Sequence, residues 1–124
     1  MIRYIDIDGQ PKPADFSIVV VARVAKACGT DVTGLVEIVQ GLGDECAFLE
    51  FAAKVGAEAL TAGAKREGTA DRYTEFDLHD IFTADITVSS TLVTMLVETL
   101  TEKAVFQEPT QASATPKKRK RADE

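Results

Sequence analysis

Apolar residues recur at helical spacing between Asp44 and Gly68, the longest periodic pattern in the chain. Two adjacent stripes result, one through Phe51, Ala52, Val55, Ala59 and Ala62 and one through Leu49, Ala53, Gly56, Leu60 and Gly63. Only a narrow ridge is polar, namely Glu50, Lys54, Glu58, Thr61 and Lys65. A helix that is apolar over most of its circumference must be covered on two sides. Gly56 and Gly63, two turns apart, are predicted to let another backbone approach closely.

The first half of the chain predicts a hairpin followed by two helices. Alternating apolar residues indicate a first strand, Asp8-Gly9 is a strong turn signal, and the return strand is broken by two prolines. The run from Phe16 predicts a helix that ends at Gly29, although its valines also fit a strand. Thr33 is predicted to cap a shorter helix, which the glycines at positions 41 and 43 terminate.

The second half predicts two further helices. Thr74 is predicted to open a helix whose first turn holds Glu75 and Asp77, favourably placed for the helix dipole. Its inward residues are predicted to be Phe76, Ile81 and Phe82. The last helix is predicted to start after Thr87 or Ser89, with an apolar face of Leu92, Val93, Leu96, Val97, Leu100 and Ala104. The predicted fold class is mainly α, a small domain of about five helices over residues 1–108 with a short N-terminal β-hairpin.

Charge is distributed unevenly along the 124 residues. Residues 1–108 carry 9 Lys and Arg against 18 Asp and Glu, a net of −9, whereas residues 109–124 carry 5 against 2, a net of +3. An acidic body argues against general binding of nucleic acid, whose affinity comes mainly from cations facing phosphates. Residues 109–124 hold almost no apolar side chains and are predicted to be a disordered basic tail. Weak nucleic-acid contact is predicted only for its basic run, Lys117, Lys118, Arg119, Lys120 and Arg121.

Cysteine usage and the lack of long apolar runs indicate a cytoplasmic protein. Cys28 and Cys46 are too far apart for a C-x-x-C motif and too few for a disulfide scaffold, so both are predicted to be reduced thiols in the core. The N-terminal sequence lacks the apolar run of a signal peptide, and no segment offers the roughly 18 uncharged apolar residues of a membrane helix. These features predict a soluble protein with no membrane partner.

No residue pattern predicts catalysis, a cofactor or a metal site. His79 lies between Asp77 and Asp80, but a metal site needs further ligands, so a partly exposed helix histidine is the better interpretation. The segment from Asp6 to Gly9 lacks the later ligands of a calcium loop and is interpreted as the hairpin turn. No general base accompanies the serines and cysteines. We therefore expect a protein that is not an enzyme.

Five segments of the chain occur together in a defined order: the DIDG hairpin, the helix closing on Ala27-Cys28-Gly29, the short second helix, the long helix ending in GAKREG, and TEFDLHDIF. This arrangement, over roughly residues 1–106, resembles the tail assembly chaperones of long-tailed bacteriophages. The resemblance implies a mostly helical protein that binds the hydrophobic tape measure protein, keeps it soluble and helps the tail tube protein to assemble around it. It implies the host-cell cytoplasm and no catalysis. The alternative is a small nucleic-acid-associated or nuclear adaptor that acts through the basic tail.

The apolar surface of the long helix is the first predicted docking surface. An interaction protein for an aggregation-prone client needs apolar helix surface beyond what its own core covers. We expect this surface to pack partly inside the domain and partly against a helical client or another copy of the chain. The predicted docking residues are Phe48, Phe51, Val55 and Leu60.

The loop after the long helix is the second predicted docking element. Arg72 and Tyr73 are of types that are enriched at binding hot spots, and Arg72 belongs with Lys65 and Arg66 to the main positive cluster of the body. The alternative is a capped turn in which Arg72 forms a surface ion pair with Glu67 or Asp71.

Overall fold

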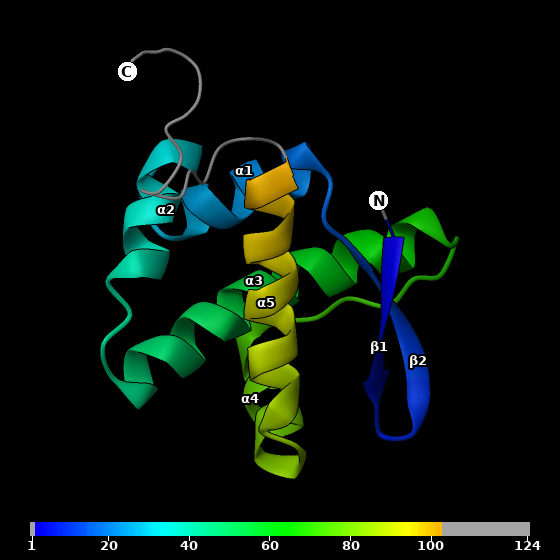
Figure 1. Cartoon of the computed structure of the whole chain (residues 1–124). Helices are drawn as coiled ribbons and strands as arrows, with labels where there is room; N and C mark the ends of the chain where they lie inside the picture. The colour runs from blue at the N-terminus through cyan, green and yellow to red at the C-terminus, as the bar shows by residue number, and fades with distance from the viewer. Residues whose placement is uncertain (1, 103–124) are drawn as a thin grey trace.

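The computed structural model describes residues 2–102, which form five helices and one hairpin (Figure 1). The elements are β1 (Ile2–Ile7), β2 (Gln10–Asp15), α1 (Ile18–Ala27), α2 (Val32–Gln40), α3 (Glu45–Arg66), α4 (Glu75–Ala84) and α5 (Thr87–Glu102). The mainly α fold with an N-terminal hairpin is thereby confirmed. The predicted tail, residues 109–124, and Ala104 of the predicted last apolar face lie outside the described residues.

The long helix α3 is the element on which the others pack. It crosses behind α5, with the hairpin against its C-terminal half and α2 near the opposite end of the molecule (Figure 1). Both predicted stripes are covered except at Leu49 and Ala62, which are half-buried. The buried residues of α3 are Phe51, Ala52, Ala53, Val55, Gly56, Ala59, Leu60, Gly63 and Ala64. Small side chains dominate this set, so the neighbouring elements approach α3 closely.

Gly63 meets backbone, as predicted, whereas Gly56 meets side chains. A Cβ built at Gly63 would lie 2.2 Å from the carbonyl oxygen of Pro13 in β2. A Cβ built at Gly56 would lie 2.5 Å from Cδ1 of Leu78 and 2.8 Å from Cδ1 of Leu92. The two glycines therefore admit different neighbours, a strand backbone at one and the leucines of α4 and α5 at the other.

The hairpin turn is confirmed at Asp8-Gly9. Ile7 pairs with Gln10, and the two turn residues both have positive φ, 57° for Asp8 and 78° for Gly9. This geometry is the two-residue turn whose twist matches that of antiparallel strands, and an Asp-Gly pair adopts it readily. Two prolines are tolerated in β2 because it is an edge strand of a two-stranded sheet. Proline lacks the backbone N–H, and on the outer edge no neighbouring strand requires that donor.

Helix starts follow the polar residues that cap them, with one correction. Asp44 and Thr74 cap α3 and α4, and Thr74 forms a reciprocal capping box with Asp77. The predicted cap of α2 at Thr33 is wrong, because Asp31 accepts from the Gly34 N–H at 2.8 Å. A capping side chain must lie before the first helical residue to reach the free N–H groups of the first turn, and Thr33 is already inside the helix.

Phe76 does not face inward, which corrects the prediction for α4. Its side chain is 79% exposed, whereas Leu78 and Phe82 are buried and Ile81 is half-buried. The inward positions are four residues apart, and Phe76, two residues before Leu78, falls on the opposite side of the helix.

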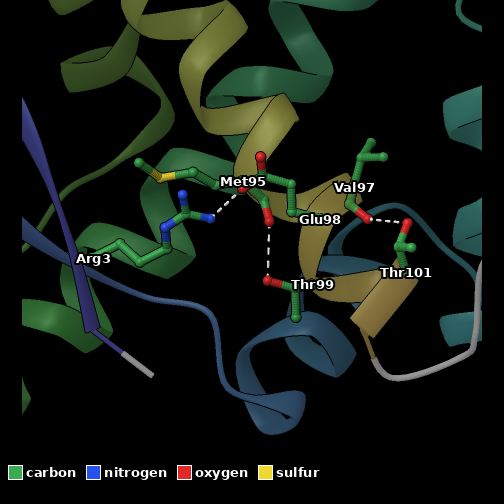
Figure 2. A network of polar contacts seen from close by, with 6 residues as sticks. All are labelled: Arg3, Met95, Val97, Glu98, Thr99 and Thr101. Carbon is green, nitrogen blue, oxygen red and sulfur yellow. Dashed lines mark hydrogen bonds and ion pairs between the residues drawn. The ribbon is translucent and has the colours of Figure 1, made fainter.

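The helix α5 presents the wide apolar face that was predicted and is tied to the hairpin. Arg3 of β1 pairs with Glu98 at 2.5 Å, as Figure 2 shows. The buried Thr99 hydroxyl donates to the Met95 carbonyl at 2.9 Å, so this polar group does not remain unsatisfied inside the core. No helix within residues 2–102 is both long and apolar enough to cross a membrane.

Candidate functional site

A groove of about 670 Å³ lies between α1, the second half of α3 and the loop that follows α3. Four cationic side chains line it: Arg23, Lys65, Arg66 and Arg72. Its carboxylates are Asp15, Glu58 and Asp71, and its apolar wall includes Val19, Val20, Ala62 and Ala70. The groove therefore combines apolar surface with a concentration of positive charge.

The loop after α3 forms one wall of the groove, because the chain reverses at the end of α3 and runs back beside this helix. Gly68, with φ of 80°, makes the reversal, and Thr69 bonds to the Ala64 carbonyl through its backbone N–H at 3.0 Å. Further on, the Tyr73 N–H donates to the Thr61 hydroxyl at 2.9 Å, and that hydroxyl lies 3.3 Å from the Tyr73 carbonyl oxygen. These bonds hold residues 69–73 against α3 without any regular secondary structure.

Asp15 forms the floor of the groove and is almost fully buried. Its carboxylate accepts from Arg66 Nε at 2.6 Å and from the Ser17 N–H at 3.0 Å. Burial by itself would raise the pKa of Asp15, but hydrogen bonds, that of Arg66 foremost, and nearby positive charge together outweigh it, so the pKa lies below its usual value. The carboxylate is therefore charged near neutral pH and fixes one of the four cations in place.

Arg72 and Tyr73 take different positions at this site. Arg72 is exposed and lines the groove, and within residues 2–102 no ion pair joins it to Glu67 or Asp71. Glu67 instead accepts a hydrogen bond from Tyr4. Tyr73 is half-buried, and its burial, with the nearby acidic groups, raises the pKa of its hydroxyl. The capped-turn ion pair predicted as the alternative for Arg72 is thus not what holds this loop.

Arg23 belongs to the same site, although the sequence alone did not indicate it. It lies on the exposed side of α1, four residues after Val19, which also lines the groove. The i to i+4 spacing places these two residues on one helix face, which is the only signal that the sequence carries. The packing of α1 on α3 then brings Arg23 to the cations of the second half of α3.

The docking residues predicted on α3 are mostly part of the core. Phe51 is 4% exposed, and Val55 and Leu60 are fully buried, so they contact their own domain in this structure. Phe48 alone among the predicted four is half-buried, near the start of α3. It belongs to a set of half-buried apolar residues that we call the α2–α3 apolar surface: Val36, Val39, Leu42, Phe48 and Leu49.

The α2–α3 apolar surface includes part of the apolar face of α2, which the contacts of this helix cover incompletely. The apolar residues of α2 lie on one side of the helix, opposite the exposed Thr33, Glu37 and Gln40. Leu35 is the only one that is buried, and the others, Val32, Val36, Ile38 and Val39, are half-buried. The helix packs mainly against α1. The apolar face of an amphipathic helix is normally covered by its own domain, and on α2 it is covered only in part.

Reactive side chains in the described residues are few and scattered. His79 is exposed on α4, where it contacts the ring of Phe76 edge to face with centroids 5.9 Å apart. Cys28 is half-buried and Cys46 is exposed, so the prediction of a core thiol is wrong for Cys46, which lies in the first turn of α3 before that helix meets its neighbours. The charge of Glu50 raises the pKa of the Cys46 thiol and so reduces its thiolate fraction.

Two sequence predictions remain, one on metal ligands and one on the basic tail. Within residues 2–102 no group of three or more His, Cys, Asp or Glu side chains comes together around a point that could hold a metal ion. The basic run Lys117, Lys118, Arg119, Lys120 and Arg121 lies outside the described residues.

The chain matched none of the protein-family models, curated proteins or solved structures with which it was compared.

Proposed function

We propose that this protein is a tail assembly chaperone that binds the hydrophobic tape measure protein of a long-tailed phage and assists assembly of the tail tube. The observation that carries the proposal is the α2–α3 apolar surface, whose five side chains are only half-buried. The order of the hairpin and the helices, which resembles that family, supports the same function. The client is an apolar helical segment, because a helix can lie along α2 and cover its half-buried apolar face.

Partial burial makes the α2–α3 apolar surface suited to reversible capture. If its five side chains each leave about 30 Å² exposed, covering them contributes about 4 kcal/mol at 25 cal/mol per Å². That amount holds a client weakly at a single site and allows it to be released when the tail tube assembles. Several chaperone molecules along a long client would multiply the effect without new contacts. The acidic body, with a net charge of −9 over residues 1–108, would keep such a complex in solution.

The proposal is tested by co-expression with a tape measure protein of a long-tailed phage, chosen from the genes that neighbour that of this chain if one of them encodes such a protein. The wild-type chain is expected to raise the soluble fraction of that client. Phe48→Asp is expected to abolish the effect, since it places a charge within the α2–α3 apolar surface. Ile86→Asp is the matched control, because Ile86 is 53% exposed and lies between α4 and α5.

Loss of client binding must be separated from unfolding. Circular dichroism of each purified variant measures the helix content, and Leu42→Asp in the connection between α2 and α3 provides a second variant outside any helix. The proposal is wrong if the wild-type chain leaves the client insoluble, or if Phe48→Asp and Leu42→Asp both solubilise it as well as the wild-type chain does.

A further inference from the structure

The outward face of α4 carries an aromatic side chain that the described part of the chain does not cover. Phe76 is 79% exposed, the highest value among the large apolar residues described, and the edge contact with His79 steadies its ring. Asp80 follows four residues later on the same face. Leu78 and Phe82 attach α4 to the core from its other side. The capping box at Thr74 makes the first turn of α4 well defined, so Phe76 is presented on a rigid element.

The groove offers the opposite chemistry. Residues 2–102 contain eight Lys and Arg, and four of them line it. When the pair of Asp15 and Arg66 is set aside, the cations Arg23, Lys65 and Arg72 face the carboxylates Glu58 and Asp71. The groove is therefore net positive in a body that is strongly negative. Exposed apolar side chains lie beside Arg23 on α1, where Val19 is 57% and Ile18 47% exposed.

We propose that the groove docks the Phe76 face of α4 from a second copy of this chain. In this contact the Phe76 ring covers Val19 of the other copy, and Asp80 lies opposite the groove cations. Charge complementarity selects this occupant, because an aromatic ring beside a carboxylate matches an apolar wall beside guanidinium groups. Arginine and aromatic side chains are also the types that carry most of the energy in protein interfaces.

The two complementary surfaces are neighbours on one molecule. Arg72 in the groove and Glu75 at the start of α4 are separated by two residues. Glu75 is held to Lys54 of α3 at 3.2 Å, one turn before the groove residue Glu58. Because the donor face and the acceptor groove adjoin, a two-fold pair of molecules uses both contacts at once, each Phe76 entering the groove of its partner.

Sedimentation velocity of the full chain over about 1 to 300 µM tests the proposal, a range suited to a weak, small interface. The wild-type chain is expected to form a dimer. Phe76→Asp is expected to raise the dissociation constant about a thousandfold, because the two-fold dimer loses two anchors at about thirtyfold each. Asp at the second position of a helix is favourable, so this variant is expected to remain folded. Ile86→Asp, which removes an exposed apolar residue beyond the other end of α4, is expected to leave the dimer unchanged.

A charge exchange tests which groups meet. Arg72→Glu and Asp80→Lys are each expected to weaken the dimer, and the double variant is expected to recover most of the loss, because the exchanged charges again attract across the interface. Raising NaCl from about 0.05 M to about 0.5 M is expected to weaken the wild-type dimer, since the pairs lie near solvent.

Three results would overturn the assignment of a second copy. They are a monomer at every concentration, a dimer that Phe76→Asp leaves intact, and a monomer that binds an acidic aromatic peptide in its groove. None of them bears on the proposed function, which rests on the α2–α3 apolar surface and is measured by the solubility of a client.

Discussion

Replacing Gly63 with alanine should destabilise the protein, although alanine favours helix more than glycine does. In the middle of α3 the change contributes about 1 kcal/mol of helix propensity. The new Cβ, however, would lie 2.2 Å from the Pro13 carbonyl oxygen and 2.8 Å from the Ala14 nitrogen. Both atoms belong to the backbone of β2, so the hairpin must move by about 1 Å, and overpacking of this kind costs about 3 kcal/mol where neither side can relax. The net loss is about 2 kcal/mol, or about 8 to 16 °C in Tm for a domain of this size.

Two other glycines provide matched controls on the same chain. At Gly34 of α2, the nearest atom to a built Cβ is the Thr30 hydroxyl oxygen at 1.8 Å, and this group can rotate away. Gly34→Ala should therefore be neutral or stabilising by up to about 1 kcal/mol. At Gly56 the obstacles are the ends of Leu78 and Leu92, which can adjust in part, so Gly56→Ala should fall between the other two.

Urea denaturation followed by circular dichroism measures all three variants, with the midpoint as the readout and the slope as a check that unfolding remains two-state. We expect Gly34→Ala to be the most stable of the three variants, Gly56→Ala to be intermediate and Gly63→Ala to be the least stable. If Gly63→Ala is as stable as the wild-type chain, β2 does not lie against α3 at that position, and the account of how the hairpin is held is refuted.

Asp15→Asn should cost about 2 kcal/mol, because it removes a charge-assisted bond from a buried group whose partner Arg66 is itself exposed. Because folding lowers the pKa of Asp15, its contribution to the free energy of unfolding is full above the unfolded pKa of about 3.9. That contribution is lost as the pH falls through the lower folded pKa. Asp15→Asn should therefore make the free energy of unfolding depend less on pH in this range. The Arg72→Ala, Tyr73→Ala double variant should weaken self-association about tenfold and leave the soluble yield of the client unchanged; reduced yield would place this loop in the client interface. Deletion of residues 109–124 should leave the thermal unfolding of the body unchanged and remove any salt-dependent nucleic-acid binding, and retained binding would contradict a role for the basic run.

The order and type of the elements could be predicted because local signals determine them. Asp8-Gly9 has the two positive φ values of its turn type, and Thr74 with Asp77 forms a complete capping box, both within four residues of chain. The close approach at Gly63 was also predictable, since a glycine on a buried stripe has no side chain to separate two backbones. The identity of the backbone that approaches Gly63 could not be predicted, because it depends on how the hairpin folds over α3.

The inward face of α4 and the composition of the groove could not be derived from periodicity. In a short helix two or three apolar residues fit more than one face, and Phe76 and Leu78 were distinguished only when α3 and α5 packed against the latter. Arg23 and Arg72 are 49 positions apart in the sequence, and only the packing of α1 on α3 and the return of the loop bring them to one site. Local patterns contain no information on such pairs.

The placement of the two candidate surfaces along α3 explains how one small chain could bind a client and a second copy at once. Phe48 belongs to the α2–α3 apolar surface and Lys65 to the groove, and the two lie 17 positions apart on one continuous helix. At 1.5 Å per residue this is about 25 Å, well beyond the distance at which substitutions usually influence each other. The core between them is packed around small residues of α3 and is therefore stiff rather than adaptable. Capture of a client at one end would then leave the groove free at the other, so a row of paired molecules could coat a long helical client without competition between the two interactions.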